Sequence, residues 1–361
     1  MFDPVKTHYQ RYPYPRYPLI ASVRRCDTYA LNLHAIWSRF NGILPPPEAK
    51  KILIAGCGTF APYTWAVANP DVPITALDLS ERSLRRARWH CLLHGRRNVD
   101  FRCGDLAGDD TIDGTFGLID SFGVLHHMED PLAGLKALER RLVPGGILRI
   151  MLYSRYARRE EESIRRAFRL LGVGTPREAR RLLNKARAGS RLARYCAATD
   201  ETVTDVGVAD ALLHPRARTY RIDGVLGMIE QAGLKPLLFA HYGAVEDVAE
   251  EISRLRALEK DHHSPGNFVV YLGRVDDTGL GKPSGGVVVV NPCLASSVGL
   301  FSFGKLRISA RVGCDNPPLG FREKSFLRKF RSPVPRNNIT GAEAELVAMY
   351  KRALFLLEYS P

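Results

Sequence analysis

Five short apolar runs between residues 51 and 153 alternate with stretches of helical periodicity, and this alternation constrains the fold more than any other feature. The runs, each expected to form a strand, are 51–55, 73–78, 98–103, 116–122 and 146–153. The segments 60–69, 80–94 and 130–142 have the pattern of helices, and Ser80 is a residue type that caps helices. Repeated strand–helix units form parallel sheets covered by helices on both faces. The sequence therefore predicts an α/β fold with a Rossmann-like, doubly wound sheet.

Two further apolar runs, 235–242 and 267–273, follow a long helical stretch. We expect them to complete a mostly parallel seven-stranded sheet with one antiparallel strand. The expected organisation is an N-terminal arm and cover helix at 1–44, a core at 45–154, an Arg-rich helical insertion before strand 6 at 155–232, the last two strands at 233–275, a turn-rich linker at 276–286 and a small C-terminal appendage at 287–361.

The chain of 361 residues has a formal charge of +14, which raises the question of an anionic partner. Residues 155–194 hold 13 basic residues against four glutamates, so most of the excess lies there. Arginine outnumbers lysine 40 to 12, which is also what a GC-rich coding bias produces. The charge therefore makes nucleic acid a conceivable partner without favouring it.

The seven cysteines are scattered and never spaced as Cys-x-x-Cys, so we expect neither disulfides nor a metal site. No apolar run approaches the roughly 18 to 20 residues of a membrane-spanning helix. The first residues also lack the order of a secretory signal. We expect a soluble, cytoplasmic protein that does not bind a membrane.

The first apolar run leads into the loop Gly56-Cys57-Gly58-Thr59. Glycines after a parallel strand let a ligand approach the main chain closely at the start of a helix. Asp78, followed by Leu79, ends the second run 20 residues after Gly58, where a carboxylate can accept both hydroxyls of a ribose. This pattern suits NAD and S-adenosylmethionine alike.

The later segments distinguish the two cofactors. Asp105 and Leu106 follow the third run, where a carboxylate can accept an adenine amino group and a leucine can pack on the ring. The fourth run leads into Phe116-Gly-Leu-Ile-Asp-Ser-Phe-Gly-Val-Leu-His-His127, and Leu142-Val-Pro-Gly-Gly-Ile-Leu148 follows. This ordered series resembles the class I S-adenosylmethionine-dependent methyltransferases over residues 45–155. The first loop departs from the family pattern, with Ile54 and Phe60 where an acid and a third glycine are common.

The resemblance implies the role of each segment. It implies that Gly56 to Thr59 line the methionine part of S-adenosylmethionine, Asp78 and Leu79 the ribose, Asp105 and Leu106 the adenine, and Ser121, Phe122 and Gly123 the floor beneath the sulfonium. Within the family the insertion occupies the place of a substrate lid. Similar N-terminal Tyr-Pro-Tyr-Pro stretches precede the domain in some uncharacterised bacterial members, so Tyr12 and Tyr14 are expected to close over the cofactor.

His126 and His127 follow the fourth strand, on the rim where an acceptor would approach, and are the candidates for a catalytic base. We expect transfer of a methyl group to an oxygen or nitrogen of a small molecule or peptide side chain. Three alternatives remain: an RNA methyltransferase using the Arg-rich insertion, a non-enzymatic S-adenosylmethionine-binding protein, and a nicotinamide-dependent dehydrogenase. An all-parallel sheet would favour the dehydrogenase, and the sequence leaves the oligomeric state open.

Overall fold

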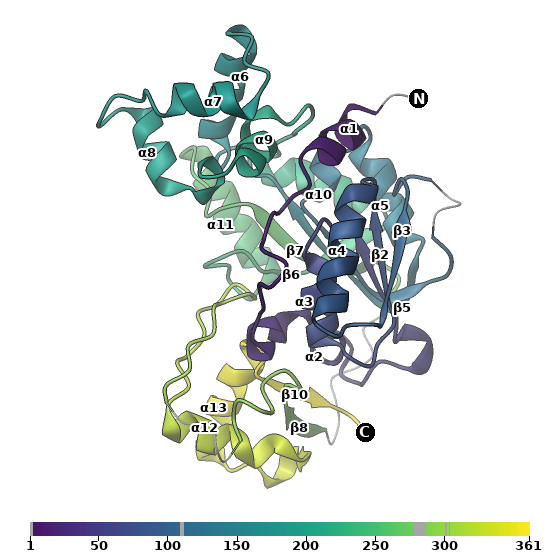
Figure 1. Ribbon diagram of the computed structural model, residues 1–361. Helices are drawn as coiled ribbons and strands as arrows, with labels where there is room; N and C mark the ends of the chain where they lie inside the picture. The colour runs from purple at the N-terminus through teal and green to yellow at the C-terminus, as the bar shows by residue number, and fades with distance from the viewer. Residues whose placement is uncertain (1–2, 109–111, 278–285, 300–301, 303) are drawn as a thin grey trace.

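The computed structural model describes residues 3–108, 112–277, 286–299, 302 and 304–361. Its central sheet has the strand order β3-β2-β1-β4-β5-β7-β6. The strands are β1 Ile52–Ala55, β2 Ile74–Asp78, β3 Val99–Cys103, β4 Phe116–Phe122, β5 Leu142–Leu152, β6 Leu234–Phe239 and β7 Phe268–Arg274. Strands β1 to β5 pair in parallel, whereas β7 runs antiparallel to β5 and β6. The predicted seven-stranded sheet with one antiparallel strand is confirmed (Figure 1).

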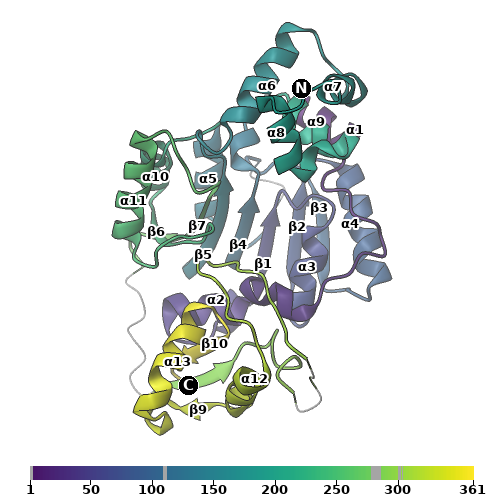
Figure 2. The ribbon, with the colours of Figure 1, turned by 90° about the vertical axis from the view of Figure 1, so that its left-hand side faces the viewer.

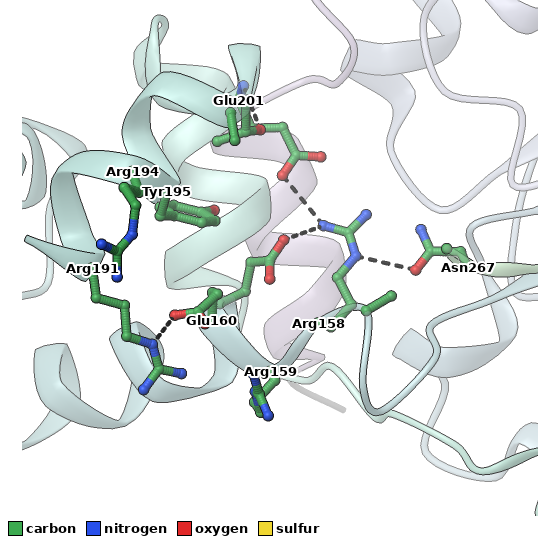
Figure 3. A pocket seen from close by; sticks show the side chains of 13 residues that line it. Arg158, Arg159, Glu160, Arg191, Arg194, Tyr195, Glu201 and Asn267 are labelled. Carbon is green, nitrogen blue, oxygen red and sulfur yellow. Dashed lines mark hydrogen bonds and ion pairs between the residues drawn. The ribbon is translucent and has the colours of Figure 1, made fainter. Parts of the chain in front are cut away.

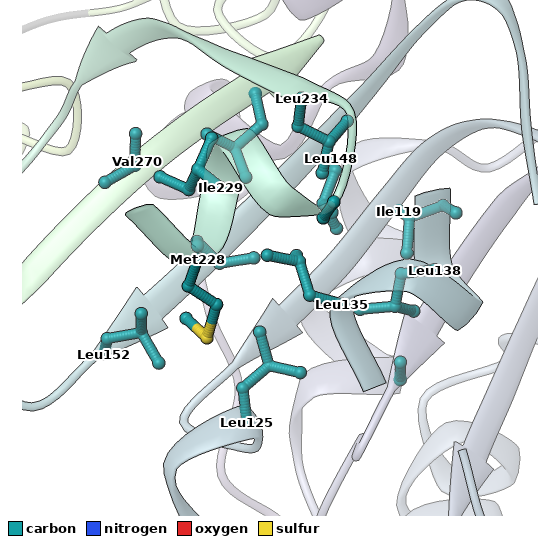
Figure 4. Packing of buried hydrophobic residues seen from close by; sticks show 14 of the residues in the cluster. Ile119, Leu125, Leu135, Leu138, Leu148, Leu152, Met228, Ile229, Leu234 and Val270 are labelled. Carbon is teal, nitrogen blue, oxygen red and sulfur yellow. The ribbon is translucent and has the colours of Figure 1, made fainter. Parts of the chain in front are cut away.

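Helices cover both faces of the sheet. They are α2 Leu33–Asn41, α3 Ala61–Ala68, α4 Glu81–Leu93, α5 Pro131–Glu139, α10 Ile222–Gln231 and α11 Val248–Lys260. Successive strand residues point to opposite faces, so Ile52 and Ile54 of β1 pack towards α2, α3 and α4. Leu53 and Ala55 pack on the other face, towards α5, α10 and α11. Figure 4 shows this second cluster, with Leu135 of α5 and Met228 of α10 close together over the strands.

The fifth strand is longer than predicted. It begins at Leu142, so the Pro144-Gly145-Gly146 turn lies inside it, and the helix predicted to reach residue 142 ends at Glu139. The register between β4 and β5 shifts between Phe116 and Leu118, which absorbs the turn as a bulge. The main chain of Gly145 is held on both sides, because its amide donates to Asp277 at 2.9 Å and its carbonyl accepts from Asn41 at 3.0 Å.

The insertion forms a small helical bundle with its own apolar core. Its helices are α6 Arg159–Leu170, α7 Pro176–Leu183, α8 Arg191–Ala198 and α9 Asp205–Leu213. Phe168, Leu183 and Leu212 lie in the core between them. Figures 1 and 2 show this bundle beyond the ends of the strands, close to the N-terminal helix α1 Pro4–Arg11. Helix α10 falls within the predicted insertion at 155–232 but packs on the sheet instead.

The C-terminal part is a second, smaller layer. It contains β8 Val287–Val290, α12 Phe321–Arg328, β9 Val334–Pro335, α13 Gly341–Arg352 and β10 Leu356–Tyr359, and its antiparallel sheet has the order β10-β8-β9. The 3-10 helix η1 Arg25–Leu31 joins this layer to the rest of the chain. Tyr29 of η1 is fully buried, and its carbonyl accepts from the amide group of Asn291 at 3.1 Å. Most of the linker predicted at 276–286 lies outside the described residues.

Among the helices of the described ranges, none combines the length and the apolar content that a membrane crossing requires. All seven cysteines are free thiols.

Gly117 of β4 lies against the short 3-10 helix η2 Pro47–Ala49, and a Cβ there would lie 2.1 Å from the carbonyl oxygen of Ala49. We expect Gly117→Ala to lower the free energy of unfolding by about 2 kcal/mol, because main-chain atoms would have to move apart. Chemical denaturation measures the change. Gly224→Ala on α10 is the control: its Cβ meets nothing within 4 Å, so stability should hold or rise by up to about 1 kcal/mol. Equal stability of Gly117→Ala and its parent would contradict the close approach.

Candidate functional site

The loop after β1 approaches two other parts of the chain closely. Gly56 has φ +76° and Gly58 has φ +57°, both in the left-handed region. A Cβ on Gly56 would lie 2.2 Å from Cγ2 of Val124, and a Cβ on Gly58 would lie 2.7 Å from the carbonyl oxygen of Tyr14. Conformation and space therefore both require glycine at these positions, and the loop presents main-chain atoms to its surroundings.

Asp78, the last residue of β2, is held beside this loop by two backbone amides. Its Oδ2 accepts from the Gly58 N–H at 2.8 Å, and its Oδ1 accepts from the Ser80 N–H at 2.8 Å. Burial raises the pKa of Asp78 to about 6, although both hydrogen bonds act to lower it. Ser80 also caps α4 as predicted, because its hydroxyl accepts from the Ser83 N–H at 3.1 Å. The carboxylate thus ties the ends of β1 and β2 together.

A cavity of about 1400 Å³ opens beside these groups and extends under the insertion. The predicted site residues in its wall are Tyr14, Gly56, Cys57, Gly58, Asp78, Leu79, Asp105, Leu106, Phe122, Gly123 and His127. The predicted site residues outside its wall are Tyr12, Thr59, Ser121 and His126. The structure therefore brings the glycine loop, Asp78, Asp105 and the end of β4 to one space.

The Tyr-Pro-Tyr-Pro segment runs directly over the glycine loop. The Thr59 N–H donates to the Tyr14 carbonyl at 3.2 Å, and the Thr59 hydroxyl donates to the Pro15 carbonyl. Further along, the rings of Tyr17 and Phe60 lie 4.5 Å apart. Thr59 thus holds the arm in place, and Tyr14 closes one side of the cavity.

The remaining predicted residues differ in exposure. Leu106 is buried, whereas Asp105 is exposed and accepts from the Ala107 N–H at 3.0 Å. Ser121 is fully buried behind the wall, while Phe122 is 45% exposed. An adenine placed here would lie beside the apolar side chain of Leu106 and the carboxylate of Asp105, which belong to one short loop.

The two histidines after β4 occupy different environments. His126 is fully buried, and its ring stacks on Tyr153 with centroids 3.7 Å apart. His127 lies in the cavity wall with Nδ1 2.6 Å from the Arg216 carbonyl oxygen, so Nδ1 donates and Nε2 is the bare nitrogen. Burial lowers the pKa of His127 to about 3, and its ring stacks on His214 at 3.7 Å. His127 is therefore a neutral hydrogen-bond acceptor and a weak base.

A hydrogen bond between the arm and the insertion was not foreseen from the sequence. The Tyr9 hydroxyl of α1 donates to Oδ1 of Asp210 in α9 at 3.0 Å, and both residues line the cavity. Tyr9 lies near the tyrosine–proline segment and Asp210 in an apolar helix, 201 positions away. No motif or spacing connects two such residues, so the sequence carried no signal for the pair.

Arg158 forms a further link between the insertion and the core. Its Nη1 lies 3.0 Å from Oε1 of Glu161 and 3.3 Å from Oε2 of Glu201, and its Nε donates to Oδ1 of Asn267 at 3.2 Å. Its guanidinium also lies 4.2 Å above the ring of Tyr153. Figure 3 shows Arg158 between the two sides of an adjoining hollow of about 820 Å³. Arg158, Glu201 and Asn267 line both spaces, so the two adjoin here.

Asp120 and Arg149 form an ion pair where strands β4 and β5 line the cavity. Arg149 of β5 donates from Nε to Oδ1 of Asp120 on β4 at 2.7 Å, and Trp65 donates from Nε1 to Oδ2 of Asp120 at 3.1 Å. Both oxygens of Asp120 thus have partners within the protein, and Arg149 balances its negative charge.

Comparison with known proteins agrees with this arrangement. Residues 53–148 match the family model described as a methyltransferase domain. An uncharacterized protein of Synechococcus sp. is 31% identical over 250 residues, which are 65% of this chain and 59% of that protein. A ubiquinone biosynthesis O-methyltransferase of Idiomarina loihiensis is 36% identical over 100 residues, which are 27% of this chain and 40% of that enzyme. The chain therefore spans about three-fifths of the first relative and two-fifths of the second.

Among solved structures, PKMT2 of Rickettsia typhi in complex with AdoHcy has a TM-score of 0.57 at 13% identity, covering 95% of this chain and 77% of that chain. This likeness concerns the fold. The sheet order with its antiparallel β7, the matching family model and the similar fold agree. Residues 53–148 thus match a methyltransferase domain, and the sheet that contains them has the fold of PKMT2.

Proposed function

We propose that the chain transfers a methyl group from S-adenosylmethionine to an oxygen or nitrogen of a small molecule or of a peptide side chain. The observation that carries the proposal is one cavity that joins Gly56, Gly58 and Asp78 to the space beneath the insertion. A cofactor and an acceptor can lie end to end in such a space. Methyl transfer is an in-line displacement, so alignment of the two reactants supplies much of the rate.

The cofactor roles follow the geometry of the wall. The main chain from Gly56 to Thr59 would hold the methionine part, and Asp105 with Leu106 the adenine. Asp78 and Leu79 would hold the ribose, because a carboxylate that accepts two amides still has lone pairs for hydroxyl donors. Ser121 to Gly123 would form the floor of the cavity beneath the sulfonium. Phe122 and Gly123 would line it directly, and the buried Ser121 would support them from behind.

The surrounding parts would enclose the reactants. The insertion would act as the lid, and Tyr14 as the cover over the glycine loop, with Tyr12 supporting it from outside the wall. The C-terminal appendage contributes Ala310 and Arg311 to the far wall. Exclusion of water by such a cover strengthens electrostatic interactions with the sulfonium.

The alternatives are less well supported. A dehydrogenase with an all-parallel sheet does not match the antiparallel β7. RNA is not favoured, because nine carboxylates and four guanidinium groups line the cavity. A non-enzymatic binder would need a closed acceptor space, whereas the cavity continues past His127 to Arg158.

Cofactor binding in this scheme requires ionised Asp78. Its pKa of about 6 in the free protein means that protons compete with the ribose hydroxyls below that pH. We expect the Kd for AdoHcy, measured by titration calorimetry, to be constant above about pH 7 and to rise about tenfold per pH unit well below pH 6. Asp78→Asn should bind more weakly than the parent above about pH 7, and the difference should shrink below pH 6, where Asp78 of the parent is protonated; Asp100→Asn, at an exposed residue of β3, should match the parent. A pH-independent Kd in the parent would contradict the assignment.

His127 is proposed to orient the acceptor through Nε2. His127→Ala should leave the Kd for AdoHcy nearly unchanged and lower turnover at least tenfold, measured as AdoHcy release with a bacterial small-molecule extract as acceptor source. His263→Ala, at an exposed histidine, is the control. Because its pKa lies near 3, His127 should contribute no inflection near pH 6.5 to the rate profile. Unchanged turnover would remove His127 from the mechanism.

A further inference from the structure

The charge of the cavity is opposite to that of the chain. The whole chain carries +14, yet its cavity is lined by nine carboxylates and four guanidinium groups. Arg149, Arg158, Arg216 and Arg311 are the cations among the residues described in that wall. An acidic cavity inside a basic protein concentrates cations, and the sulfonium of the cofactor is one of them.

Most of these carboxylates are already engaged. Asp27, Asp120, Glu129 and Glu201 pair with arginines, and Asp3 and Asp130 cap helices. Asp78 and Asp105 have the cofactor roles proposed above. The carboxylate left over is Asp210, which makes no ion pair with any residue that the structure describes.

Asp210 is 6% exposed and lies in the wall of the cavity. Oδ1 accepts from the Tyr9 hydroxyl at 3.0 Å, and Oδ2 receives no hydrogen bond from the described part of the chain. Arg165, the nearby buried cation on α6, does not line the cavity and donates its Nε to the Ala211 carbonyl at 2.6 Å. Burial raises the pKa of Asp210 to about 6, against the lowering effect of the Tyr9 hydrogen bond. The group is thus a buried carboxylate with one oxygen available to a donor.

Three tyrosines surround the same space. Tyr9, Tyr14 and Tyr153 line the cavity together with Asp210, and they come from α1, the arm and the end of β5. Burial raises the pKa of each tyrosine, so the phenols stay neutral. Aromatic faces attract organic cations, and a buried carboxylate adds a charge-assisted hydrogen bond. These groups together fit an ammonium ion.

We propose that the methyl acceptor is an amine that enters as its ammonium form and is bound by Asp210 among Tyr9, Tyr14 and Tyr153. This inference rests on the proposed function and names its substrate class. Asp210 takes one proton from the ammonium nitrogen and passes it to solvent. The freed nitrogen lone pair forms the N–C bond to the methyl group, the C–S bond breaks, and its electron pair returns to sulfur, so that AdoHcy leaves as a neutral thioether.

The test compares phenethylamine with 2-phenylethanol, its uncharged counterpart, as ligands of the full chain saturated with AdoHcy at pH 7.5. Titration calorimetry should show at least tenfold tighter binding of the amine. Asp210→Asn should remove that preference without changing the affinity for the alcohol or for AdoHcy. Asp205→Asn, an exposed acid at the start of the same helix, should behave as the parent.

Three outcomes would overturn the inference. The amine and the alcohol could bind the parent equally tightly. This outcome is measured on the parent alone, so it does not depend on whether a variant folds. Asp210→Asn could weaken AdoHcy itself, which would assign the carboxylate to the cofactor's own ammonium group. Asp210→Asn could also keep the preference for the amine. Failure of the cofactor assignment, on which the proposed function depends, is distinguishable from all three, because the parent would then not bind AdoHcy.

Discussion

The hydrogen bond from the Gly58 N–H to Asp78 is the interaction on which the site depends. It fixes the glycine loop against the end of β2, and the same glycine leaves room for the Tyr14 carbonyl. A side chain at position 58 would disturb the loop and the arm together. The loop conformation, which suits only glycine, and the burial of the carboxylate, which raises its pKa to about 6 and costs stability when it is ionised, are both specific to this site. Such features are common where a protein presents main-chain atoms and a carboxylate to a ligand.

The N-terminal arm connects parts of the chain that are far apart in sequence. Tyr9 bonds Asp210 in the insertion, Tyr14 and Pro15 accept from Thr59 in the core, and Tyr29 accepts from Asn291 in the C-terminal layer. A buried hydrogen bond of this kind is worth about 1 kcal/mol. The arm therefore joins three packing units through many modest contacts, and a change in one unit can reach the cavity through it.

The sequence predicted what local spacing determines. The doubly wound, mostly parallel sheet, the loop at Gly56 and the position of Asp78 at the end of a strand follow from strand–helix alternation, and the structure bears out that fold. The sequence did not predict the extension of β5 to Leu142, because a Pro-Gly-Gly turn usually marks the end of a strand. Here pairing with β4 accommodates the turn as a bulge within the strand. The sequence also missed the Tyr9–Asp210 contact, which depends on how a bundle with its own core docks over the sheet. The environment of His127 depends equally on that docking, through Arg216 and His214.

The arm, the glycine loop and the lid are proposed to enclose one ligand site. Hydrogen–deuterium exchange of the full chain, followed by mass spectrometry with and without AdoHcy, tests this claim most directly. Bound AdoHcy should slow exchange in peptides covering 9–15, 55–60 and 205–213 together. Slower exchange confined to 55–60 and 74–80, with the arm and α9 unchanged, would contradict the claim and leave the arm as packing on the outside of the core.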